Sequence, residues 1–201
     1  MRDRDLVRLY WPAELRPAFD ALFAIDDAMA DAVAKATDPT LAAIKLAWWR
    51  ERLEGLDEGQ VPAEPRLQSA AADLISRGIT GSALALLEAG WAELLQPVSD
   101  PEVAIGRGAT LFHLAGHLLG NTPPPVLETA GRFYAAGQLH RLGRSVVNPW
   151  VVTELRGIPR QYRPLTALAA LAERDLRLTE PEATPGRAWA LLRHRWTGRI
   201  G

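Results

Sequence analysis

Apolar residues recur at helical spacing along most of the chain, and proline and glycine divide this pattern into segments of helix length. No Val/Ile-rich stretch alternates as a strand would. The predicted helices cover residues 12–36, 39–55, 64–77, 80–95, 101–120, 124–147, 164–178 and 185–197. Prolines at or near helix starts support these limits, because the first turn needs no proline N–H. With short connections between neighbours, the pattern predicts an all-α, single-domain helical bundle over residues 1–201.

Composition narrows the function classes. The chain has 201 residues, 48% of them hydrophobic, and a net charge of -1, so it fills one core and shows no whole-chain signature of nucleic-acid binding. Cysteine is absent, which excludes disulfides and thiolate metal sites. The N-terminus lacks the apolar core of a signal peptide, and no apolar run reaches the roughly 18 residues of a membrane span. We therefore expect a cytoplasmic location, with attachment to the periphery of the inner membrane left open.

One carboxylate lies in an unusual place in the first long helix. Asp26 falls in the middle of the apolar stripe, which consists of Leu15, Phe19, Leu22, Asp26, Met29 and Val33. A carboxylate on a core-facing stripe needs compensation, because an unpaired buried charge is very costly. Two interpretations stay open: an Asp–Arg pair inside the bundle, or a residue that lines a polar ligand cavity.

The other carboxylates of this helix lie on a different face. Asp20, Asp27 and Asp31 lie together there, and Lys35 follows Asp31 by four residues, the spacing of an exposed ion pair. The pattern favours a solvated helix face for Asp27 and Asp31, with a ligand-binding role as the alternative.

Aromatic and histidine pairs give weaker signals. Trp48 and Trp49 point about 100° apart on their helix, so at most one can face the core while the other lines a groove. Both are interpreted as structural, and a wall of an apolar tunnel for an isoprenoid or acyl chain is the alternative. His113 and His117 share a helix face, but no third ligand accompanies them, so the sequence favours core or groove histidines over a metal site.

The last predicted helix is amphipathic and basic. Between Ala183 and Gly201 the chain has four arginines and no acid, and Trp189, Leu192 and Trp196 recur at helical spacing. One interpretation is a last core helix with a solvated arginine face. The other is contact with an anionic membrane or an acidic partner.

Several motifs together resemble the squalene/phytoene synthase family. The resemblance is strongest over residues 1–56 and weaker farther along the chain. The motifs that carry it are Asp3-Arg4-Asp5, Tyr10-Trp11-Pro12, Leu22-Phe23-Ala24, the segment Leu46-Ala47-Trp48-Trp49-Arg50, Leu114-Ala115-Gly116, and Gly137-Gln138-Leu139 followed by Arg144. The resemblance implies the isoprenoid-synthase fold in a truncated form, since catalytic members are usually longer.

The resemblance also implies a diphosphate site in which two aspartate clusters on facing helices bind Mg²⁺. In the register of the family, only Asp31 matches the first cluster. In the second, Ser145 stands in place of the aspartate, and no acid lies between Glu128 and Glu154. The substrate-binding candidates are Asp26, Asp31, Gln138, Arg141 and Arg144. If the protein is an enzyme, the metal candidates are Asp26, Asp27, Asp31 and Glu93.

These departures predict a protein without catalysis and without a cofactor, similar to the family branch that assists assembly of respiratory complex I. Its expected partners are a membrane surface or a subunit of the respiratory complex, and an isoprenoid or lipid ligand. The alternative is a prenyl-diphosphate transferase that uses Mg²⁺ on the shifted carboxylates. A third possibility is a lipid carrier or membrane-peripheral binding module.

Overall fold

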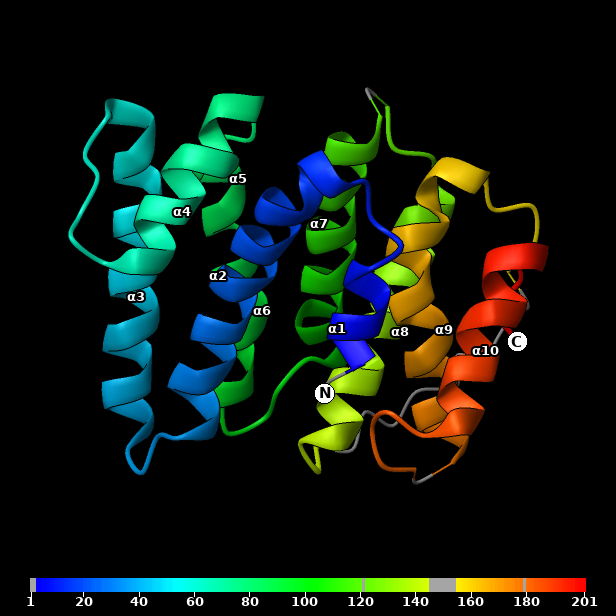
Figure 1. Ribbon diagram of the computed structural model, residues 1–201. Coiled ribbons are helices and arrows are strands. Elements are labelled where there is room, and N and C mark those ends of the chain that lie inside the picture. The colour runs from blue at the N-terminus through cyan, green and yellow to red at the C-terminus, as the bar shows by residue number, and fades with distance from the viewer. Residues whose placement is uncertain (1–2, 121, 145–154, 179) are drawn as a thin grey trace.

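The computed structural model describes residues 3–120, 122–144, 155–178 and 180–201, and every regular element in them is a helix (Figure 1). One isolated antiparallel bridge joins Leu155 to Ile200. The predicted all-α class and single helical domain are therefore confirmed. None of the helices described has both the length and the apolar content needed to cross a bilayer.

Most elements follow one another with short connections, whereas residues 142–159 separate α8 from η5. The α-helices are α1 (Asp3–Arg8), α2 (Arg16–Ala34), α3 (Pro39–Gly55), α4 (Pro65–Asp73), α5 (Gly81–Ala85), α6 (Leu87–Ala92), α7 (Pro101–Leu119), α8 (Val126–Arg141), α9 (Arg163–Arg177) and α10 (Pro185–Thr197). Short 3-10 turns lie at η1 (Ala13–Leu15), η2 (Leu56–Glu58), η3 (Ile75–Arg77), η4 (Glu93–Leu95) and η5 (Arg160–Tyr162).

The helix limits agree best where proline and a capping side chain coincide. The ranges of α3 and α10 match their predictions, and both helices begin at a proline. The Asp38 side chain accepts from the Thr40 N–H at 2.8 Å, and the Thr184 hydroxyl accepts from the Arg187 N–H at 3.4 Å. These side chains satisfy backbone donors that the first turn leaves without an intrahelical partner.

Several elements differ from the prediction. The predicted helix 12–36 is divided into η1 and α2, and the predicted helix 64–77 into α4 and η3. Helix α1 was not predicted. The predicted helix 80–95 is divided at Leu86 into α5, α6 and η4, although the buried positions Leu84, Leu87 and Trp91 keep one helical period across the break. Helix α8 ends at Arg141 because Gly143, with a φ of 69°, adopts the left-handed conformation that commonly ends a helix. Positions 145–147 of its predicted range lie outside the described residues.

The helices form a bundle in which α1 lies across the front (Figure 1). Helices α3, α4 and α5 make one end, α2, α6 and α7 the middle, and α8, α9 and α10 the other end. Helices α7 and α8 approach closely, since a Cβ added to Gly108 or to Gly131 would lie 2.0 or 2.1 Å from the carbonyl oxygen of the other glycine. Gly116 also permits close packing, because a Cβ there would lie 2.6 Å from Leu127.

Aromatic rings connect α2 to α7 and α8 through the core. The Phe19 ring lies 4.6 Å from both the Trp11 and Phe23 rings, and Tyr134 lies 5.9 Å from Phe23 and 5.5 Å from Phe112. Such rings contribute much of the apolar area that stabilises a core of this size. This packing fixes the face of α2 that carries Asp26 against α7 and α8.

The two tryptophans of α3 differ in burial, as predicted. Trp49 is buried, whereas Trp48 keeps 36% of its surface exposed and meets Trp49 edge to face at 5.2 Å. Both rings line an open groove between α2 and α3, together with Ala28 and Ile44.

Candidate functional site

The carboxylate of Asp26 in α2 is fully buried and meets side chains of α6 and α7. Its Oδ1 accepts from Arg107 Nη1 of α7 and from Trp91 Nε1 of α6, each at 2.8 Å. The Asp26 and Arg107 side chains are both 0% exposed. Of the two interpretations of Asp26, the structure supports the Asp–Arg pair inside the bundle. A pair this deeply buried is costly to break, because either partner alone would remain an uncompensated charge.

Arg107 extends the network of Asp26 to α8. Its guanidinium lies 3.7 Å from the centre of the Trp91 ring, and its Nη2 donates to Gln138 Oε1 at 2.6 Å. Asp26 and Gln138, two of the predicted site residues, are therefore joined through a residue that sequence reasoning missed. We call Asp26, Trp91, Arg107 and Gln138 the polar centre. Within the described structure, Asp26 Oδ2 and Arg107 Nε have no hydrogen-bond partner.

Arg107 had a detectable signal in the sequence. It lies among apolar residues of α7 that recur at helical spacing, as Asp26 does in α2, and a buried arginine needs a carboxylate for the same reason. A glycine inside a predicted helix, Gly90, was a second signal, since such a glycine often has a packing reason. In the structure, a Cβ at Gly90 would lie 2.6 Å from the Arg107 Cβ.

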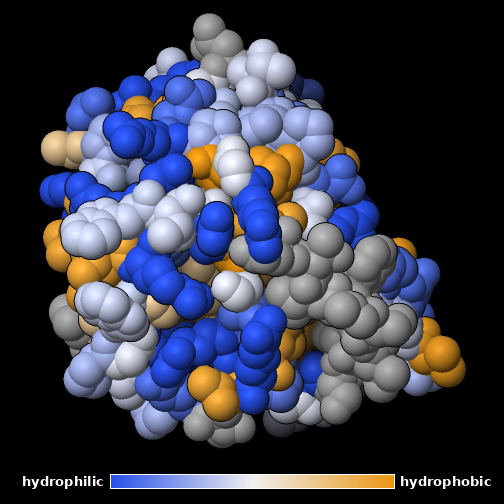
Figure 2. Space-filling model, turned by 90° about the vertical axis from the view of Figure 1, so that its right-hand side faces the viewer, coloured by the Kyte–Doolittle hydropathy of each residue, from blue (hydrophilic) through white to orange (hydrophobic). Residues whose placement is uncertain are grey.

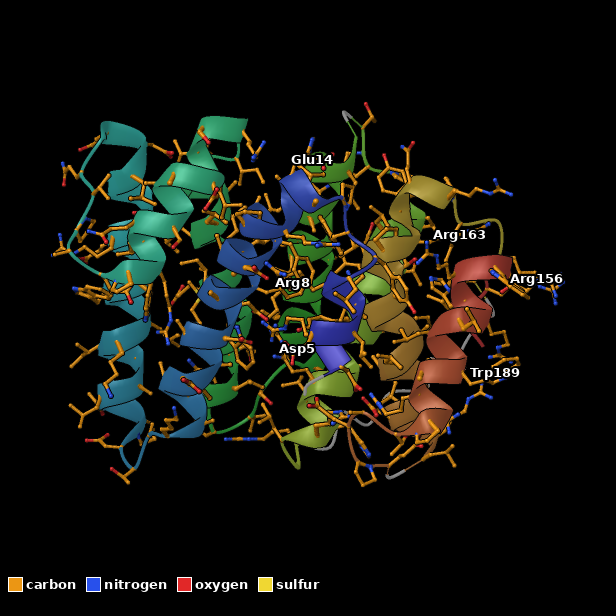
Figure 3. All side chains as sticks on the ribbon, viewed as in Figure 1. Asp5, Arg8, Glu14, Arg156, Arg163 and Trp189 are labelled. Atoms are coloured by element: carbon orange, nitrogen blue, oxygen red, sulfur yellow. The ribbon has the colours of Figure 1, made fainter. Side chains whose placement is uncertain are left out.

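Helix α1 covers the second acidic face of α2. Arg4 donates to both carboxylate oxygens of Asp27, at 2.7 and 2.6 Å, and Arg8 Nε donates to Asp20 at 2.7 Å. Figure 3 shows Arg8 between α1 and α2. Asp27 is therefore paired and half-buried rather than solvated as predicted. Asp31 keeps the predicted exposed pair with Lys35, at 2.9 Å.

A second charged network joins α1 to α8, α9 and α10. Arg187 is buried, donates from Nε to Asp3 at 2.6 Å and pairs with Asp175. Arg141 donates to the two oxygens of Asp175 at 2.6 and 2.8 Å. Burial of this many charges is tolerable because each guanidinium meets at least one carboxylate.

A cavity of about 160 Å³ lies between these networks. Gln138 and Arg141, both predicted to bind substrate, line it together with Tyr134. Burial raises the pKa of the Tyr134 hydroxyl well above its usual range, so the phenol remains protonated. The charged residues of the lining are Asp3, Arg4, Arg141, Asp175, Glu182 and Arg187, in which acids and bases balance.

The remaining candidates lie elsewhere. Glu93 accepts from the Asp100 N–H at 2.6 Å and so connects η4 to the start of α7, and Arg144 is exposed beyond the end of α8. In the parts of the chain that the structure describes, no three His, Asp or Glu side chains are grouped as a metal site. The carboxylates predicted for the enzyme are therefore not gathered. The predicted position of Ser145 lies outside the described residues.

The histidines of α7 form a pair at the surface. The Nε2 atoms of His113 and His117 lie 3.1 Å apart, and both rings are exposed. His113 lines an open groove beside the prolines that precede α8, and no third ligand accompanies the pair in the described structure.

No protein-family model, curated protein or solved structure matches this chain. The resemblance to squalene/phytoene synthases therefore rests on the short motifs alone.

Proposed function

We propose that this protein is a non-catalytic relative of squalene/phytoene synthases that assists the assembly of respiratory complex I. One observation carries the non-catalytic part. The carboxylates of α2 that would have to bind Mg²⁺ already meet cations of the protein, because Asp26 pairs with Arg107 and Asp27 with Arg4. Metal binding would have to separate a buried ion pair, which costs several kcal/mol (about 3–5).

The facing helix supports the same proposal. Gln138 uses its side-chain oxygen to accept from Arg107, and α8 has no carboxylate beside it that could hold a second cation. Ionisation of a prenyl diphosphate needs positive charge held on more than one helix. The described residues do not fit a magnesium site.

The size of the cavity favours an assembly role over an isoprenoid carrier. Ligand pockets usually enclose about 300–1,000 Å³. The cavity beside Gln138 has about 160 Å³ and a charged lining, so a prenyl chain does not fit unless α1 moves away. An isoprenoid or lipid ligand would have to bind an open groove such as the one beside Trp48.

The catalytic alternative is tested by incubating the purified protein with Mg²⁺ and farnesyl or geranylgeranyl diphosphate. We expect no release of pyrophosphate above the background without protein. Formation of squalene, phytoene or a cyclopropyl intermediate would replace the proposal with the prenyl-diphosphate transferase.

The assembly role is tested by deleting the gene in its own host and measuring assembled complex I on native gels. We expect less assembled complex, restored by the wild-type protein and also by the Asp27→Asn variant, which retains the polar centre. An unchanged amount of assembled complex I would rule out the assembly role.

A further inference from the structure

The apolar residues that recur at helical spacing in α10 lie on its outer, exposed side. Trp189, Leu192 and Trp196 are 66%, 37% and 77% exposed, and Figure 3 shows Trp189 on the side of α10 that faces away from α9. The helix packs on α9 through Leu191 and His194 instead. The interpretation of this stripe as core is therefore wrong. Large exposed aromatic side chains in a row commonly mark an interaction surface.

A basic notch opens beside this stripe, where the start of α9 meets the end of α10. It has a volume of about 510 Å³, and its lining includes Tyr10, Arg160, Arg163, Arg195 and Trp196 but no carboxylate. Figure 2 views this end of the molecule, where strongly hydrophilic side chains are mixed with pale and apolar ones.

The arginines of the notch differ in their contacts. Arg163 donates to the carbonyl oxygens of Arg195 and Trp196, each at 2.9 Å, and so ties the end of α10 to the start of α9. Arg195 lies 4.8 Å from the centre of the Tyr10 ring. Arg160 is exposed, and no hydrogen bond or ion pair joins it to another described residue. Among the residues that the structure describes, none neutralises the charges of Arg160 and Arg195.

We propose that this face docks the protein on an anionic lipid bilayer. Arg160 and Arg195 contact the lipid phosphates, and Trp189, Leu192 and Trp196 lie at the level of the headgroups. Charge complementarity favours this occupant, since basic side chains without acids are attracted to anionic leaflets. Tryptophan supports it further, because its amphipathic ring prefers the membrane–water interface. The proposal stands whether or not the protein assists complex I assembly.

The test is sedimentation of the full chain with vesicles that contain phosphatidylglycerol, compared with vesicles of phosphatidylcholine alone. We expect binding to the anionic vesicles at low salt and its loss as ionic strength rises. Each basic residue near such a surface contributes about fivefold in affinity, so Arg160→Glu/Arg195→Glu should weaken binding at least about 25-fold.

A matched control variant exists on α3 and α4. Arg52 lies 6.0 Å from the centre of the Trp48 ring, much as Arg195 lies over Tyr10, and Arg66 is exposed like Arg160. Arg52→Glu/Arg66→Glu makes the same change in net charge and should leave vesicle binding within about twofold, because only distant charge is altered. Circular dichroism verifies that both variants remain folded.

A second variant tests the apolar part without changing charge. Trp189→Ala/Trp196→Ala removes exposed rings only, so the fold should persist while vesicle binding falls. The proposal is overturned if the wild-type protein does not sediment with anionic vesicles at low salt. It is also overturned if the two arginine variants lose binding equally, or if phosphatidylcholine vesicles bind as well.

Discussion

The polar centre and the basic notch both contain arginines, but the two regions use them in opposite ways. In the polar centre, Arg107 is fully buried and meets the carboxylate of Asp26 at 2.8 Å. In the notch, Arg195 meets an aromatic ring, and Arg160 extends into solvent. A guanidinium that has a buried carboxylate partner holds helices together, whereas one without a partner remains available to an external anion.

The largest expected effect comes from breaking the buried pair on one side only. Asp26→Asn leaves Arg107 buried beside a neutral amide and should lower the free energy of unfolding by about 3–5 kcal/mol. Asp27→Asn removes a partner of Arg4 that is 34% exposed, and should cost less than about 1 kcal/mol. Urea unfolding followed by circular dichroism compares the two variants. Equal midpoints would show that Asp26 has no special role.

The next effect concerns the close approach of α7 and α8, which places Arg107 beside Gln138. Gly131→Ala puts a methyl group 2.1 Å from the Gly108 carbonyl oxygen and should destabilise the protein by about 1–3 kcal/mol. Gly106→Ala is the matched control, because no atom lies within 4 Å of the added Cβ. That variant should have a free energy of unfolding up to about 1 kcal/mol higher, because alanine favours the helix more than glycine does. Similar melting temperatures for the two variants would contradict the close packing.

His194, beside the notch, gives stability a pH dependence. Burial lowers its pKa below the ordinary 6.5, with Arg163 and Arg193 acting in the same direction, although hydrogen bonding opposes the shift. The unfolded state therefore binds the proton first as pH falls. Stability from this group is complete above about pH 6.5 and decreases below it, by at most about 1.4 kcal/mol per pH unit.

The measurement is urea unfolding of the wild-type protein and of His194→Gln between pH 7 and 5.5. The wild type should lose more stability than the variant over this interval, whatever the absolute stability of the variant. Identical slopes would mean that His194 titrates alike in the folded and unfolded states.

The smallest expected effect lies at the outer edge of α1. Arg8 and Asp20 are 39% and 45% exposed, so Arg8→Met should change the free energy of unfolding by less than about 0.5 kcal/mol. Unfolding at low and high salt checks this value. A loss above 1 kcal/mol would show that α1 is held by this pair rather than by Arg4 and Asp3.

The sequence predicts the fold class and most helices because apolar period, proline and capping residues all act locally. Local signals also placed Asp26 in the apolar stripe. They do not reveal its partner, since Arg107 lies far along the chain and reaches Asp26 only when α7 packs on α2. Helix α1 was missed because ion pairs to Asp27 and Arg187 hold so short a segment, and isolated helices of this length are unstable.

The sequence also did not reveal which face of α10 is exposed. Trp189 and Trp196 form the more apolar stripe by sequence, yet α10 packs through Arg187, Leu191 and His194. The reason lies in remote residues, because Asp3 and Asp175 bind Arg187 and Thr166 lies 2.9 Å from His194. A polar face that finds buried partners can therefore replace an apolar one at a helix interface.

Charges in the polar centre are neutralised by partners within it, whereas those in the notch are open to anions. The most direct test is an NMR titration of the arginine Nε–Hε signals with magnesium pyrophosphate, which is also the product of the catalytic alternative. We expect shifts at Arg160 and Arg195, and none at Arg107 of the polar centre or at Arg4, which pairs with Asp27. Shifts at Arg4 and Arg107, with Arg160 and Arg195 unchanged, would contradict it.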